Sequence, residues 1–222
     1  MKLMENWRFA VKCIKLSYNL KANLLCIGFS SVMALVYEIG NFSNGMGAIL
    51  MLTVGIYPAS MICSVCGSQL VLSSPHKKAI MTSVPAIITF CSGMLAYLAV
   101  IGIEAIRAMG NPEAAEYSAR VILLLGVVLM IMEIYVSIAY KYFVVSTVVV
   151  IGCLTGSYYL MDFFGDGVLS MSWLSGISMS VAIAVGLCLA VLGSLLQYGI
   201  SLLVYKKPVS RGAIYGLLRQ QA

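Results

Sequence analysis

Charged residues are scarce in this chain. Only 10% of its 222 residues are charged and 61% are hydrophobic, whereas about 25% of the residues in soluble domains are charged. This scarcity excludes a soluble globular domain and indicates a polytopic membrane protein. Alternating segments of about ten residues, which mark a membrane β-barrel, are also missing. The membrane spans are therefore predicted to be helices.

Catalytic motifs are missing as well. The sequence has neither a GxxxxGK[ST] nucleotide loop nor an HExxH zinc motif. Its one histidine, His76, has no acid and nucleophile arranged with it. We therefore expect no enzyme activity and no metal or other cofactor on this chain. The net charge of +6 is explained by basic segments that face anionic lipid, which argues against nucleic-acid binding.

The seven cysteines lie mostly within apolar runs, where they are expected to act as small buried hydrophobic residues. Cys63 and Cys66 form a CxxC pair, but no second pair or nearby histidine accompanies it, so no metal or redox role is expected. The first 21 residues contain dispersed basic residues and no compact apolar core, which differs from a secretory signal peptide.

Apolar runs divide the chain into six predicted spans within a single transmembrane domain of residues 1–222. The predicted fold class is an all-α polytopic integral membrane protein, with spans at about 22–37, 46–72, 80–103, 119–140, 142–161 and 177–205. Pro58 is expected to kink the second span. The very short connection at Lys141 predicts an antiparallel hairpin of the fourth and fifth spans, and residues 104–118 are predicted to form a solvated connection.

The distribution of basic residues predicts the orientation of the chain. With the N-terminus in the cytoplasm, 12 of the 14 Lys and Arg residues fall on the cytoplasmic side, and only Arg107 and Arg120 fall outside. Six of the eight acidic residues also fall outside. The positive-inside rule therefore predicts six spans with both termini cytoplasmic.

A basic amphipathic segment precedes the first span. Aromatic and aliphatic residues recur at helical spacing, and basic residues fall on another face. An interfacial helix is predicted at residues 3–20, carried by Trp7, Arg8, Val11, Lys12, Ile14, Lys15 and Tyr18. The alternative is a simple basic anchor for the first span.

A short basic break separates the second and third spans. It consists of Ser73, Ser74, Pro75, His76, Lys77 and Lys78. A polar, basic cluster in so short a loop is predicted to be a docking point for a partner. Under the alternative, Lys77 and Lys78 only fix the topology.

Two features within the spans are candidates for function or assembly. Glu133 is the one carboxylate placed inside a predicted span, which makes it a functional-site candidate, with a purely structural glutamate as the equal alternative. Small residues at four-residue spacing predict helix-packing faces, formed by Ser178, Ala182, Gly186, Ala190, Ser194, Gly152 and Gly156. Such faces pack helices within one chain more often than between two chains.

The whole arrangement resembles the membrane subunit of type-2 ABC exporters. The resemblance rests on the basic amphipathic helix, the six spans, the Ser-Ser-Pro-His-Lys-Lys loop between spans two and three, the tight hairpin, and the aromatic, Gly-containing segment at 162–173. It covers nearly the whole chain, although the loop motif itself is short. The chain departs from the common pattern in its very short loops and in lacking a large extracellular domain.

The resemblance implies a permease subunit in the bacterial inner membrane, paired with an identical or homologous second chain and with two ATPase subunits. The 73–78 loop would contact the ATPase, which binds ATP and Mg²⁺, while this chain carries no cofactor. A small amphipathic peptide is the first expected substrate, and a lipid or drug is the second. The alternatives are the substrate-binding membrane subunit of a vitamin importer, an integral-membrane enzyme, and an immunity or assembly factor.

Overall fold

The computed structural model describes residues 20–39, 46–66, 73–109, 112–139 and 176–206, together with residue 71 and short pieces within 7–17, 141–142 and 148–156. Every regular element in this part of the chain is a helix, as predicted. The helices are α2 (Leu20–Ile39), α3 (Met46–Cys66), α5 (Lys77–Met81), α6 (Ser83–Ala108), α7 (Pro112–Ala139) and α9 (Met179–Tyr205).

Four helical stretches are long and apolar enough to cross a membrane. They are Leu20–Tyr37, Lys77–Ala108, Ala114–Ala139 and Met179–Tyr205, and α3 adds the shorter apolar stretch Gly47–Cys63. The 26 residues of α6 extend for about 39 Å at about 1.5 Å per residue, which exceeds the roughly 30 Å hydrocarbon core of a bilayer. These properties confirm the expected class, a helical integral membrane protein. The count of six spans, the cytoplasmic termini and the interfacial helix stay predictions.

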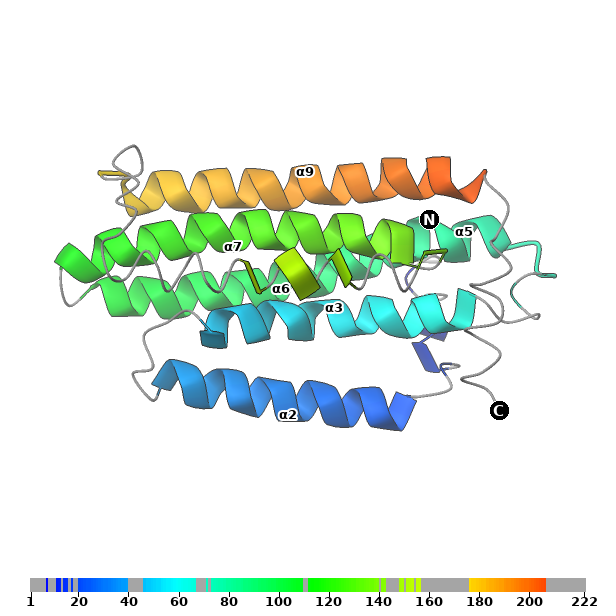
Figure 1. The fold of residues 1–222 in the computed structure, drawn as a ribbon, viewed down its shortest axis with the longest axis horizontal. Coiled ribbons are helices and arrows are strands. Elements are labelled where there is room, and N and C mark those ends of the chain that lie inside the picture. Colours follow the sequence, from blue (N-terminus) through cyan, green and yellow to red (C-terminus); the bar gives the residue numbers. More distant parts are fainter. Residues whose placement is uncertain are drawn as a thin grey trace.

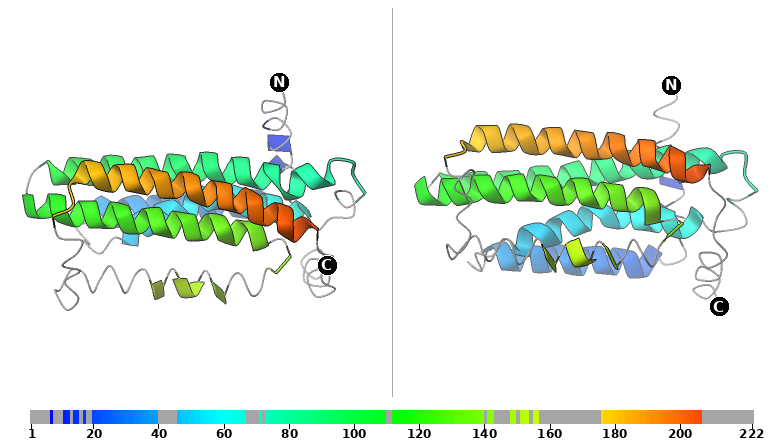
Figure 2. Two further views of the ribbon diagram at one scale, coloured as in Figure 1. Left: turned by 90° about the horizontal axis from the view of Figure 1, so that it is seen from above. Right: turned by 45° about the horizontal axis from the view of Figure 1, so that its top comes forward.

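The long helices lie side by side along a common axis (Figure 1). α2 and α6 run in one direction, whereas α3, α7 and α9 run in the other (Figures 1 and 2). Because α7 and α9 are parallel, the chain has to return along the bundle between residues 139 and 179. The fifth span is predicted in this passage, most of which lies outside the described residues. The described helical turns at 148–156 lie about midway along the bundle (Figure 2).

Close contacts at glycines hold the bundle together. A Cβ on Gly55 of α3 would lie 2.9 Å from the Ser92 carbonyl oxygen and 3.1 Å from the Cα of Gly93 on α6. A Cβ on Gly126 of α7 would lie 2.9 Å from the Cα of Gly186 on α9. Without a strong hydrophobic force between helices in lipid, such close approach supplies the van der Waals contact that keeps spans together. The bundle is therefore built on small residues at its helix crossings.

The helix boundaries differ from the predicted spans at both ends of α6 and at the start of α7. The helical structure begins at Lys77, in the short helix α5, and α6 continues to Ala108, five residues past the predicted end. α7 begins at Pro112, where a proline is tolerated because the first helical N–H needs no partner. Only residues 109–111 therefore lie between α6 and α7, and most of the predicted solvated connection is helical.

Candidate functional site: the basic turn and the buried polar layer

A hydrogen-bonded turn leads from the end of α3 into α5. The Ser74 N–H donates to the Val71 carbonyl at 3.1 Å, and the Lys77 N–H donates to the Ser74 carbonyl at 3.1 Å. The Ser74 hydroxyl accepts a further bond from the His76 N–H at 3.2 Å. These bonds fix the path of the chain through residues 73–78, which we call the basic turn.

The basic turn presents polar side chains on a buried foundation. Its outward-facing members are exposed or half-buried, and the two apolar residues that follow, Ile80 and Met81, are buried. The Cys66 thiol at the end of α3 donates a weak bond to the Ile80 carbonyl at 3.7 Å. α5 packs against α3, α6 and α9. The turn is therefore an exposed projection anchored to three of the long helices.

A break at Thr82 separates α5 from α6. Thr82 has φ −125° and ψ −74°, outside the helical range, and its hydroxyl donates to the Lys78 carbonyl at 2.6 Å. Pro85 follows in the first turn of α6, where its missing N–H costs little. The break therefore lies within the apolar stretch Lys77–Ala108 and divides it into α5 and α6.

Cations gather at the end of the bundle that holds the basic turn, which we call the cationic end. In the described part of the chain this end holds no acidic residue, and its basic residues are Lys12, Lys15, Lys21, Lys77, Lys78, Lys141 and Lys206. The opposite end, formed by the end of α6 and the start of α7, holds Glu104, Arg107, Glu116 and Arg120. This distribution matches the charge asymmetry on which the predicted orientation rests.

Lys141, the residue of the predicted short connection after the fourth span, is buried at the cationic end. Its side chain is 2% exposed, and its Nζ donates to the carbonyl of Val204 in the last turn of α9. A cation is favourable at a helix C-terminus because the terminal carbonyls carry partial negative charge. Lys141 therefore ties the end of α7 to the end of α9.

The described residues of the predicted interfacial helix lie at the cationic end (Figure 2). Trp7, Val11, Lys12 and Lys15 are exposed, and Ile14 packs against the core of the bundle. Arg8 and Tyr18 lie outside the described residues. This segment therefore lies at the same end of the bundle as the basic turn, and its interfacial role stays a prediction.

Glu133 lies in the interior of the bundle, between α7 and α9. Its side chain is 0% exposed, and neither carboxylate oxygen has a hydrogen-bond partner. Oε2 occupies the space that a Cβ on Gly193 of α9 would fill. The absence of a side chain at Gly193 is therefore what gives the carboxyl group room.

A second buried polar group lies one turn farther along α9. Gln197 is 0% exposed, and its Nε2 donates to the hydroxyl of Thr89 on α6 at 3.2 Å. The Thr89 hydroxyl in turn donates to the Pro85 carbonyl at 2.8 Å. The Oε1 atom of Gln197 has no partner. Residues Thr89, Glu133, Gly193 and Gln197 form what we call the buried polar layer.

The register of α6 against α7 places these groups at one level. In this antiparallel pair, Gly93 lies against Leu129 and Glu104 against Ser118. Each pair is symmetric about residue 111, so the same register sets Thr89 opposite Glu133. Three helices therefore contribute residues to a single buried layer.

The predicted small-residue face of the last span lies partly inside the bundle. Ala182, Gly186 and Ala190 are buried, Ser194 is half-buried, and Ser178 is exposed before the start of α9. Gly193 is buried instead of Ser194, because residues four apart drift around a helix with 3.6 residues per turn. The buried part of this face packs within the chain. Gly152 and Gly156 are exposed, and a Cβ added at either glycine would meet nothing within 4 Å.

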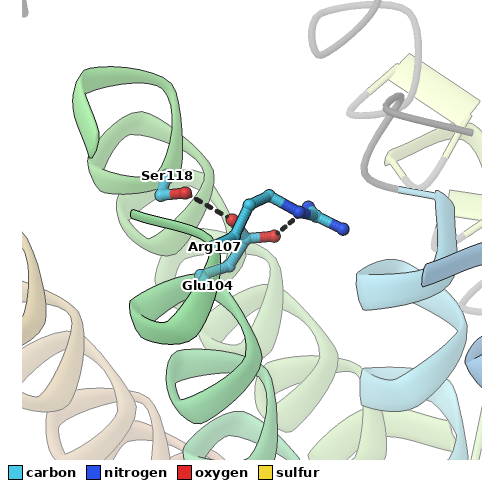
Figure 3. A network of polar contacts seen from close by, with 3 residues as sticks. All are labelled: Glu104, Arg107 and Ser118. Carbon is cyan, nitrogen blue, oxygen red and sulfur yellow. Dashed lines mark hydrogen bonds and ion pairs between the residues drawn. The ribbon is translucent and has the colours of Figure 1, made fainter. Parts of the chain in front are cut away.

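A polar clasp joins α6 and α7 at the opposite end (Figure 3). Glu104 is 1% exposed. Its Oε2 accepts a hydrogen bond from the Ser118 hydroxyl at 2.6 Å, and its Oε1 accepts one from Arg107 at 2.9 Å. This charge-assisted bonding compensates the burial of the carboxylate. Glu104 was expected in a solvated connection, and the symmetric pairing about residue 111 is the signal that would have placed it opposite Ser118.

We expect Glu104→Ala to lower the melting temperature of the detergent-purified protein. The substitution removes the acceptor of a buried hydroxyl and of a charged group, at a cost of about 1–3 kcal/mol. Glu116→Gln is the matched control, because Glu116 is 43% exposed and pairs with Arg120 at the surface, where such pairs contribute about 0–1 kcal/mol. Equal shifts for the two variants would contradict the clasp.

Comparisons with family models, curated protein sequences and solved structures found no match to this chain. The functional assignment therefore rests on the sequence pattern and on the geometry described above.

Proposed function

We propose that this chain is the membrane permease subunit of an ATP-driven ABC exporter. The observation that supports it best is the basic turn, which is exposed, fixed by hydrogen bonds, and anchored on α3, α6 and α9 at the cationic end. A loop that only reverses the chain direction does not need packing contacts with three helices. A loop that transmits force from a partner protein to the helices does need them.

The proposed partner is a separate ATPase subunit that binds ATP and Mg²⁺ and docks on the cytoplasmic face. Closure of two such subunits would press on the basic turn and on the segment at 7–17, which lies at the same end of the bundle. α5 would transmit the displacement to α6 directly and to α3 and α9 through its buried contacts. Under this proposal the chain supplies the transport path and the coupling surface, and the partner supplies hydrolysis.

A second permease chain, identical or homologous, completes the proposed exporter. The surface available for this second chain is α2, which lies at the margin of the bundle (Figure 1), next to α3. Its apolar side chains are largely exposed, among them Leu25 (74%) and Phe29 (70%). Such a surface suits lipid and a second helical bundle equally well. The proposed substrate is a small amphipathic peptide, and a lipid or drug is the second choice.

Photo-crosslinking in native membranes tests the docking site. A photoreactive residue at position 76 is expected to capture a protein with a P-loop ATPase sequence, identified by mass spectrometry. The control is the same residue at position 109, because Met109 is exposed at the opposite end. Capture of lipid alone from position 76, or equal ATPase capture from both positions, would refute docking at the basic turn.

A further inference from the structure

The atoms of the buried polar layer that lack a hydrogen-bond partner are all oxygen atoms. In the described part of the chain, three of its atoms are buried without a partner: Oε1 and Oε2 of Glu133 and Oε1 of Gln197. All three are acceptors when the carboxyl group is ionised. A buried acceptor without a donor is costly, and a buried charge without a partner costs far more. The layer therefore lacks a donor.

The orientation of Gln197 follows from its neighbour. The hydroxyl of Thr89 spends its one hydrogen on the Pro85 carbonyl, so toward Gln197 it can only accept. The donating Nε2 of Gln197 must therefore face Thr89, as observed. The acceptor Oε1 is left for another group. On α9, Gln197 lies one turn from Gly193, whose position the Glu133 carboxyl group adjoins.

No other group in the neighbourhood supplies the missing hydrogen. None of the titratable or charged side chains on the described parts of α7 and of the helices packed against it is bonded to Glu133. In the half of the bundle that contains Glu133 they include Cys63 of α3, Cys91 and Tyr97 of α6, Tyr135 of α7, Tyr198 and Tyr205 of α9, and Lys141 after α7. Tyr97 donates instead to the Ile122 carbonyl at 2.8 Å, and Lys141 donates to Val204.

We propose that Glu133 is a proton-binding site, whose carboxylic acid O–H donates to Oε1 of Gln197. The carboxylate takes one proton from water, which removes the buried charge and supplies the donor that Oε1 of Gln197 lacks. A hydrogen-bond chain then runs from Glu133 of α7 through Gln197 of α9 and Thr89 of α6 to the Pro85 carbonyl. A proton is favoured over a larger cation because Oε2 fills the space beside Gly193 and the side chain has no exposed surface.

Under this proposal, any movement of α7 relative to α9 would change the protonation of Glu133. Parting of the two helices would admit water to Glu133, and a hydrated carboxyl group gives up its proton at neutral pH. Closing the helices again requires that a proton be taken up. Each opening of this contact would therefore exchange one proton, whether or not the chain belongs to an exporter.

Infrared spectroscopy of the intact protein in lipid at neutral pH tests the proposal. The wild type is expected to show the carbonyl-stretch band of a protonated carboxylic acid, although exposed carboxyl groups are ionised at this pH. Glu133→Gln should lose the band completely. Glu104→Gln should keep it, because Glu104 is buried but paired as a carboxylate.

A second variant keeps the test decisive if Glu133→Gln does not fold. Glu133→Asp retains an acid one methylene shorter and should show the same band at a shifted frequency. The proposal is overturned if the wild type lacks the band, or if the band is the same in the wild type and in either Glu133 variant. Failure of photo-crosslinking at position 76 would leave this result unaffected, so the two proposals stand or fall separately.

Discussion

Gly186→Leu is expected to prevent α7 and α9 from packing, at a cost of about 3 kcal/mol or more. A Cβ at this position would collide with the hydroxyl group of Tyr97. Tyr97 is 0% exposed, and its hydroxyl donates to the Ile122 carbonyl at 2.8 Å. Moving the ring away would break that bond and leave the buried hydroxyl without a hydrogen-bond partner.

The backbone contact beside Tyr97 makes the site still less tolerant. A Cβ on Gly126 would lie 2.9 Å from the Cα of Gly186, so the two helices are already at their closest approach. A leucine at 186 has to push α9 away from α7, and this separation would propagate to Gly193 and Glu133 on the same interface.

The effect of Gly186→Leu is best measured as the melting temperature and the monodisperse yield of the detergent-purified protein. Gly199→Leu provides the matched control, because Gly199 is in the same helix and nothing lies within 4 Å of its Cβ position. Leucine is a better helix former than glycine by up to about 1 kcal/mol, so the control should be neutral or slightly stabilising. Equal melting temperatures and yields for the two variants would contradict a close contact between α7 and α9 at Gly186.

Lys77→Glu combined with Lys78→Glu is expected to reduce the ATPase activity that co-purifies with the chain by about tenfold or more. Placing like charges opposite each other costs several kcal/mol at an interface, and a surface that binds this turn has to be complementary to its lysines. Lys78 is exposed and Lys77 half-buried. The variant should therefore fold, and its own melting temperature should change little.

A second pair of lysines controls for the change in net charge. Lys21 and Lys206 are both exposed at the cationic end and lie outside the basic turn. Lys21→Glu combined with Lys206→Glu makes the same change of four charge units on the same side. Its ATPase retention should stay near that of the wild type. Equal losses in both double variants would mean that the lysines only fix the topology.

The sequence predicted the helical membrane class because composition and apolar run length determine it. It also located the basic turn, because a basic stretch between two apolar runs is visible without any contact. Glu133 was identified by its position inside a span. Its lack of a partner was not predictable, because that depends on which residues of α6 and α9 face it.

Contacts between distant segments account for what the sequence did not predict. α6 continues past residue 103 to Ala108, and Glu104 in this extension is paired with Ser118 and Arg107. A lone glutamate after an apolar run otherwise indicates exposure. The burial of Lys141 likewise depends on the end of α9, which supplies the Val204 carbonyl. In both cases hydrogen bonds across helices, rather than local composition, decide burial.

The function proposed here depends on an ATPase partner at the cytoplasmic face. Its most direct test is to purify the wild-type chain from native membranes in mild detergent and to measure ATP hydrolysis on what it retains. The expected result is a stoichiometric P-loop ATPase with activity above that of a mock purification. An intact, monodisperse chain that never retains an ATPase would contradict the proposed function.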